Sequence, residues 1–435
     1  MFQYFIISQS PPYFLSETPK PLMAFFCYLF SSFINYLIIS FLISLGFFYF
    51  LKISEKFSNS FFAGFLAFLY SLFFFEDSWQ NLLSVYWVFL YIPIMIISLY
   101  YFLIKDYLKY GVLNLIAGLI RPDAWFIAFI FLLPVFFWKE KKSLFLFLPF
   151  LAPVVWLFFD YRAFSTPFYS FIITARYPII TGIPLVKPQN FFPIVFKDLS
   201  SQTGWLFLII CFLAIISTIY HCRNNLESYL ILLAAIFSPF VFYFLLSFRG
   251  GVLPMRRFFL LSLFFLSFFL FQTFDIFFKK KNIKFLLPII LFLLLFFINP
   301  PIDKIENIKW NLKDEEDKMI AIENSIPVIK NYLLTLKPKY LIIPFRRKVI
   351  FEYYLSKSEI SNNLESFREI IALKKNIKDY ENSLVFYLLK DFAGVETFFD
   401  FLSQFRVHTL EEENLMFEPI FSHPWYRVYF LKKIE

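Results

Sequence analysis

Residues Gly111 to Trp138 read GVLNLIAGLIRPDAWFIAFIFLLPVFFW, an apolar run whose only charged residues are Arg121 and Asp123. Charged side chains at membrane depth cost roughly 2.5 to 3.5 kcal/mol each on insertion scales, so they face a partner, a water-filled cavity or a substrate. The triplet Arg121-Pro122-Asp123 is therefore a candidate site. Its sequence predicts that Arg121 is a phosphate or structural anchor which Asp123 orients.

Lysine groups flank this run on both sides, namely Lys105, Lys109, Lys139, Lys141 and Lys142. Because lysine-rich connections mark the cytoplasmic side of a membrane, both ends of the run are expected on that side. The arms before and after Pro122 are each too short to span a bilayer, and proline disfavours helix in the residue before it. The sequence predicts a re-entrant hairpin with its tip at the outer face. The alternative is one proline-kinked spanning helix with Arg121 snorkelling.

The composition extends this membrane interpretation to most of the chain. Hydrophobic residues make up 59% and charged residues 17% of the 435 residues. Apolar segments near the length that a span needs lie at about 22–51, 60–75, 82–104, 111–138, 143–159, 204–220, 229–248, 258–278 and 285–299. The predicted fold class is an α-helical polytopic membrane bundle of about 8 to 10 membrane segments, one of them re-entrant, followed by a small C-terminal α/β soluble domain.

Two domains are expected, a transmembrane domain over residues 1–300 and an extracytoplasmic domain over residues 301–435. After Pro300-Pro301 the composition becomes mixed. Helical patterns are predicted around 311–336 and 363–375, strands at 340–344, 384–388 and 426–431, and a solvated turn at Glu411-Glu412-Glu413. The net charge of +9 reports orientation against the bilayer, and without a clustered soluble basic face no nucleic-acid partner is expected.

Arginine is concentrated on one predicted side of the bundle. With the hairpin, residues 1–20, 75–81, 160–203, 249–257 and everything after 300 lie outside, and the cytoplasmic loops hold lysine with one arginine, Arg223. Arginine grips phosphate oxygens through two hydrogen bonds, which predicts an anionic ligand at the outer boundary. The substrate-binding candidates are Arg121, Asp123, Arg162, Arg176, Lys187, Arg249, Arg256 and Arg257.

The acids of the outer connections are the catalytic candidates, namely Glu17, Glu76 and Asp77. A carboxylate pair such as Glu76-Asp77 acts as a general base or binds a divalent cation, and the alternative is an exposed turn. The long loop 161–203 is either a lid over a lipid-borne substrate or an ordered interfacial cap. Gly250-Gly251 with its neighbouring arginines either approaches a ligand or anchors to lipid headgroups.

Several classes of site are disfavoured. His221, His408 and His423 are too scattered to form a metal-ligand set, so any metal remains unknown. No Ser-His-Asp order, P-loop, GxGxxG or HExxH motif is present, which argues against hydrolase, nucleotide-driven and zinc-peptidase functions.

Residues 15–300 resemble the GT-C superfamily of polytopic membrane glycosyltransferases, which use polyprenyl-phosphate sugars. The stretch Gly118 to Asp123 (GLIRPD) is similar to the R-P-[DE] stretch of those enzymes, Gly250 to Phe259 looks like the GG…M…R-[FY] stretch before a late span, and Thr18 to Leu22 looks like the end of the first outer loop. The resemblance implies transfer of a sugar to a glycan, lipid or protein acceptor hydroxyl at the outer face of the cell (inner) membrane, among membrane lipids. An acid of the first outer loop would take the proton, and arginines would stabilise the lipid phosphate.

The chain departs from that family at its start. The family has a spanning helix before the first outer loop and an Asp where that loop begins, whereas here a few mostly apolar residues precede Ser8. The first transmembrane helix is thus expected to be missing, which leaves Glu17, Glu76 and Asp77 as the acids. Two other functions stay open. One is a lipid-linked saccharide transporter or flippase, and the other is a non-catalytic envelope membrane protein whose soluble domain binds a partner.

Overall fold

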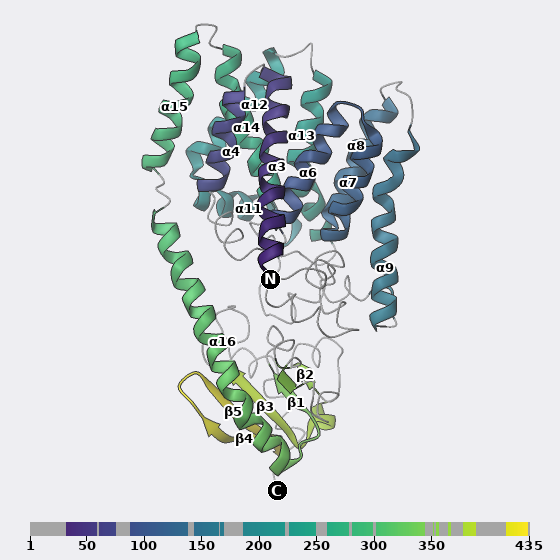
Figure 1. Ribbon diagram of the computed structural model, residues 1–435, viewed down its shortest axis with the longest axis vertical. Coiled ribbons are helices and arrows are strands. Elements are labelled where there is room, and N and C mark those ends of the chain that lie inside the picture. The colour runs from purple at the N-terminus through teal and green to yellow at the C-terminus, as the bar shows by residue number, and fades with distance from the viewer. Residues whose placement is uncertain are drawn as a thin grey trace.

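The computed structural model of the chain is mostly helical and carries a small sheet near its C-terminus (Figure 1). It describes residues 32–58, 61–74, 88–137, 143–164, 166–168, 186–221, 226–248, 259–277, 281–298, 302–343, 351, 354–355, 364–366, 377–388 and 415–433.

Each of the nine predicted apolar segments contains a helix. The helices before the sheet are α3 (Ser32–Ser58), α4 (Phe61–Phe74), α6 (Val88–Leu103), α7 (Tyr107–Ile120), α8 (Asp123–Phe137), the 3-10 helix η2 (Leu144–Phe150) that continues into α9 (Leu151–Phe164), α11 (Pro188–Thr203), α12 (Trp205–His221), α13 (Leu226–Ser247), α14 (Leu260–Phe277), α15 (Lys281–Ile298) and α16 (Ile302–Leu336).

Among the described residues, three helical stretches are long and apolar enough to cross a membrane: Leu37–Phe57, Leu144–Arg162 and Ser228–Ser247. A fourth is added if the bent pair Pro188–Ser200 and Trp205–Tyr220 counts as one span. The apolar helices are therefore compatible with a membrane protein, and the count of 8 to 10 membrane segments stays a prediction.

The chain reverses between α7 and α8. The rings of Tyr110, near the start of α7, and Phe131, well inside α8, have centroids 6.2 Å apart. In one continuous helix the rise of 1.5 Å per residue would separate them by about 30 Å. Phe102, at the end of α6, packs on both rings with centroids 4.8 Å away. The two arms thus form an antiparallel hairpin, as the sequence predicts, and a single kinked helix does not describe them.

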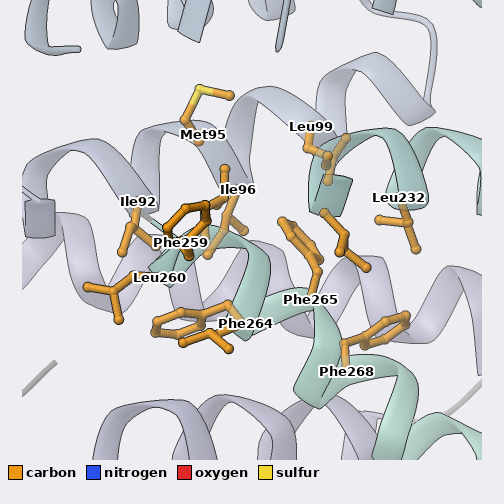
Figure 2. Packing of buried hydrophobic residues seen from close by; sticks show 14 of the residues in the cluster. Ile92, Met95, Ile96, Leu99, Leu232, Phe259, Leu260, Phe264, Phe265 and Phe268 are labelled. Carbon is orange, nitrogen blue, oxygen red and sulfur yellow. The ribbon is translucent and has the colours of Figure 1, made fainter. Parts of the chain in front are cut away.

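The core beside this hairpin is built from α6, α13 and α14. Figure 2 shows Ile92 of α6 near Phe259 and Leu260, while Leu99, further along α6, lies on the side of Phe265. Because both helices advance in the same direction, α6 and α14 run parallel and begin at the same end of the helical region. The many phenylalanines have a packing role here, since aromatic rings bury a large apolar area.

Lysines gather at the opposite end of α6. Lys56, near the end of α3, donates to the carbonyl of Leu103. Lys109 forms an ion pair with Asp106 at 2.8 Å and lies over the ring of Tyr101, with Nζ 4.8 Å from the ring centroid. The hydrogen bond from Lys109 lowers the pKa of the Asp106 carboxyl below its ordinary value. Lysines from two predicted cytoplasmic connections therefore do lie together at one end.

The C-terminal sheet has five strands: β1 (Leu341–Ile343), β2 (Leu364–Ser366), β3 (Ser383–Leu388), β4 (Leu415–Ser422) and β5 (Tyr426–Lys433). Their order is β2-β1-β3-β5-β4, with β1 parallel to β2 and β3, and with β5 antiparallel to β3 and β4. One face packs Leu384 and Phe386 against Ile326 and Ile329 of α16, which crosses the sheet in Figure 1. This is the small mixed sheet expected of an α/β unit.

Three local predictions need correction. Leu364–Ser366 is a strand where a helix was predicted over 363–375, because pairing with buried β1 outweighs the local helical pattern of so short a segment. Strand β4 was missed, since Pro419 argues against a strand; it lies on the sheet edge at a bulge, where proline is tolerated. The loop 160–203 contains the end of α9 and all of α11. The predicted turn at 411–413 lies outside the described residues.

Candidate functional site

The hairpin tip forms because the two residues after α7 cannot continue its helix. Arg121 is extended, with φ −144° and ψ 131°, the backbone region that a residue before proline prefers. Pro122 has no N–H group, so the carbonyl of Gly118, four residues earlier, has no helical donor. The helix α8 then begins with the acidic residue Asp123, whose charge suits a helix N-terminus.

Two tryptophans supply the donors that Pro122 lacks. The indole nitrogen of Trp125, on α8, donates to the carbonyl oxygen of Gly118 at 3.0 Å, and that of Trp156, on α9, donates to the same oxygen at 3.1 Å. The two rings meet edge to face, with centroids 5.7 Å apart. An unpaired carbonyl in hydrocarbon would cost several kcal/mol, so these bonds stabilise the end of α7.

Gly118 has no room for a side chain. A Cβ atom there would lie 2.8 Å from Cβ of Ala152 and 2.8 Å from Nε1 of Trp125, closer than real contacts allow. Two helical turns earlier, a Cβ atom on Gly111 would collide with the carbonyl oxygen of Phe145. The two glycines let η2 and α9 lie directly on α7. Gly118 therefore provides both the space and the acceptor for the indoles.

Arg121 and Asp123 form a buried ion pair inside this tip. Their side chains are 4% and 2% exposed, and Nε of Arg121 lies 2.7 Å from Oδ1 of Asp123. The guanidinium also lies over the ring of Tyr91, 4.8 Å from its centroid, and donates to the hydroxyl of Tyr243 at 3.4 Å. The hydroxyl of Tyr91 donates to Oδ2 of Asp123 at 3.5 Å. Both charges of the triplet thus have partners within the protein.

This network joins three parts of the helical region. Tyr91 belongs to α6, Tyr243 to α13, and the ion pair to the hairpin tip. Phe259, just before α14, packs on Tyr243 with ring centroids 5.8 Å apart. Both oxygens of Asp123 accept hydrogen bonds in a buried position, which suits a structural role better than that of a proton-accepting base. The network of Arg121, Asp123, Tyr91 and Tyr243 is called the latch below. Asp123 is thus the ion-pair partner of Arg121, and the predicted role of the two residues in substrate binding stays a prediction.

The remaining predicted residues divide into two groups. Arg162 is exposed on the last turn of α9, and Lys187 is exposed at the N-terminal end of α11. The others lie outside the described residues, namely Glu17, Glu76, Asp77, Arg176, Arg249, Arg256 and Arg257. Their roles stay predictions. Within the described ranges, no group of three or more His, Cys, Asp or Glu lies close enough to hold a metal ion.

The tyrosines and tryptophans of the tip were not predicted from the sequence. Tyr91 and Tyr243 lie in apolar runs where one hydroxyl gives no signal. Trp125 and Trp156 had an available signal, because Pro122 at membrane depth leaves one carbonyl unpaired and a nearby indole is a suitable donor.

Comparisons with protein-family models, with curated proteins and with solved structures each found no match.

Proposed function

We propose that this chain is a membrane glycosyltransferase of the GT-C type, which transfers a sugar from a polyprenyl-phosphate donor to an acceptor hydroxyl at the extracytoplasmic face. The observation that carries the proposal is the GLIRPD stretch, in which the glycine, the proline and the two charged residues each have a structural role. Gly118 accepts the indoles, Pro122 ends the helix, and Arg121 and Asp123 form the latch. Because these residue types are each needed for the structure of the tip, the GLIRPD stretch supports the resemblance more strongly than a match of the sequence alone would.

The polarity of the helical region supports the proposed orientation. The latch lies at the start of α6, where Tyr91 bonds Asp123, whereas Lys56 contacts the last residue of α6. With lysine on the cytoplasmic side, the hairpin tip is at the outer face, and the hairpin is re-entrant. The soluble domain after residue 300 then lies outside the cell membrane.

The proposed donor site adjoins the latch. Arg256 and Arg257 come three and two residues before Phe259, which packs on Tyr243, and Arg249 follows the last residues of α13. We assign these arginines, with Arg162, Arg176 and Lys187, to the lipid phosphate. Charge-assisted donors aimed at a departing phosphate stabilise the charge that develops on it.

The proposed reaction breaks the bond between the anomeric carbon and the phosphate oxygen, and forms a bond from that carbon to the acceptor oxygen. The acceptor proton passes to the carboxylate of Glu76 or Asp77, with Glu17 as the third candidate, and the lipid phosphate leaves with the bonding electron pair. General-base catalysis of this kind contributes about 10²- to 10⁴-fold. A divalent cation held by the same acids would add charge stabilisation at the phosphate.

The test measures release of free polyprenyl phosphate, which does not require the acceptor to be known. Membranes that contain the full chain are incubated with a panel of synthetic polyprenyl-phosphate hexoses and pentoses and with extract of the source cells. We expect release with at least one donor, and at least about a 100-fold loss in the double variant Glu76→Gln/Asp77→Asn, as expected when a general base is removed. Glu55→Gln, which alters an exposed acid at the lysine end, is the matched control and should retain release.

Two results would contradict this proposal. One is full release by the double variant, which would remove Glu76 and Asp77 from the chemistry. The other is movement of an intact lipid-linked sugar across sealed vesicles without release of polyprenyl phosphate from any donor, which is the behaviour of a transporter.

A further inference from the structure

Helix α11 is amphipathic and only partly covered by the protein. Phe191, Val195 and Leu199, spaced four residues apart, are buried. The ring of Phe192 lies 5.0 Å from that of Phe244, and the ring of Phe196 lies 6.3 Å from that of Phe240, both on α13. One side of α11 is therefore fixed on α13, near the same end as Tyr243.

Two phenylalanines of α11 that pack on α13 are also partly exposed. Phe192 and Phe196 are 39% and 40% exposed, and their rings stack with centroids 6.2 Å apart. At 3.6 residues per turn, Asn190 and Lys197 lie about 100 to 160° further around the helix. Both are exposed, so the apolar flank borders a polar one.

Helices α12 and α13, which contact α11, also bear exposed apolar side chains. On α13, Leu245 and Val241 are 51% and 40% exposed within the candidate span Ser228–Ser247. On α12, Leu206 and Ile209 are 51% and 53% exposed. Exposed apolar areas of this extent mark contact with a membrane or a partner.

The direction of α11 differs from that of the helix it precedes. The two helices are bent by 111° at Gly204, whose φ of 79° favours glycine. Hence α11 does not extend α12 as one straight span. A helix that leaves the direction of its neighbouring span, with an apolar flank and a charged one, has the geometry of a helix in the plane of the membrane interface.

We propose that α11 is an interfacial helix that binds the outer leaflet of the membrane. Phe192 and Phe196 enter the boundary between headgroups and acyl chains, and Lys197, which neighbours Asp198 in the sequence, contacts lipid phosphates. The occupant is anionic phospholipid, because α11 contacts two helices with exposed apolar side chains, α12 and α13, and because the helix with its N-cap holds two lysines against one acid. The inference rests on the membrane embedding of the chain and does not depend on sugar transfer.

The test places one nitroxide label at a time on the full chain in nanodiscs of phosphatidylcholine and phosphatidylglycerol, after Cys27, Cys211 and Cys222 are replaced by serine. Labels at Phe192→Cys and Phe196→Cys should collide more often with apolar oxygen than with a water-soluble nickel chelate. The label at Asn190→Cys, the control on the polar flank, should show the reverse order. Opposite accessibilities to oxygen and nickel on the two flanks of one helix would distinguish insertion into the membrane interface from a helix that is shielded on all sides.

A second measurement tests the charge contacts. Lys197→Gln should lower the amount of phosphatidylglycerol that copurifies with the chain, while the label at residue 196 stays oxygen-accessible. Equal nickel access at positions 190 and 196 would overturn the proposal. Exclusion of both oxygen and nickel at 196 would indicate a covering protein surface and would overturn it too. None of these outcomes bears on polyprenyl phosphate release, so the two proposals fail separately.

Discussion

Replacing Asp123 with asparagine should destabilise the protein by about 3 to 5 kcal/mol, the range expected when one partner of a buried ion pair is removed. Arg121 would keep its charge and remain buried, and it would lose the charged carboxylate that lies 2.7 Å from its Nε. The double variant Arg121→Leu/Asp123→Leu removes both charges and should recover a large part of the loss, because the desolvation of both groups disappears with them.

The measurement is unfolding of the detergent-solubilised chain, followed by intrinsic tryptophan fluorescence. The control is Asp106→Asn, which breaks an exposed ion pair with Lys109 and should cost at most about 1 kcal/mol. The latch would be refuted if Asp123→Asn were no more harmful than Asp106→Asn. It would also be refuted if the double variant were as unstable as the sum of its single changes.

Replacing Gly118 with valine should cost about 3 kcal/mol or more, because two losses combine. Overpacking against Ala152 costs about 1 to 3 kcal/mol, since Cβ would come within 2.8 Å of that residue. Displacing Trp125 and Trp156 breaks two hydrogen bonds worth about 1 kcal/mol each and leaves a carbonyl unpaired.

Val112→Ile is the matched control, because it adds carbon to an exposed position of the same helix. It should change stability by at most about 0.5 kcal/mol, as surface substitutions do. The same unfolding measurement applies, together with the yield of folded chain in membranes. Near-native stability of Gly118→Val would show that α9 and the two indoles are not held against α7 as described.

Much of the helical architecture follows from local sequence patterns. Lysines on both flanks of residues 111–138, with Pro122 between two short arms, predict the reversal that the rings of Tyr110 and Phe131 demonstrate. The chemistry of the triplet also predicts that Arg121 and Asp123 need partners at membrane depth. In the structure the two side chains form an ion pair with each other. Their spacing in the sequence alone does not determine that pairing.

The contacts that the sequence did not reveal depend on tertiary structure. Tyr91 and Tyr243 come from helices far apart in the chain, and their pairing with the latch depends on how α6 and α13 pack. Helix α11 was missed because Pro188, Pro193 and interspersed polar residues obscure its apolar period. Strand β2 has three residues and forms only because β1 provides a partner. Local propensity carries too little free energy to decide such elements.

The catalytic part of the site stays at the level of prediction. Glu17, Glu76 and Asp77 were chosen because they are acids in connections expected outside, and they lie beyond the described residues. What the structure adds is a reason to exclude Asp123 from that role, since both of its oxygens are engaged in a buried network.

The central claim is that the chain enters the membrane at α7, turns at Pro122 and returns to the same side at the end of α8. Labelling of single cysteines with a membrane-impermeant maleimide tests this most directly, in the cysteine-free chain, with intact cells and inverted vesicles compared. Lys109→Cys and Ser143→Cys, at the two ends of the hairpin, should both react only in inverted vesicles, and Arg162→Cys, at the end of α9, should react only in intact cells. Reaction of positions 109 and 143 from opposite sides would contradict the re-entrant hairpin and the orientation built on it.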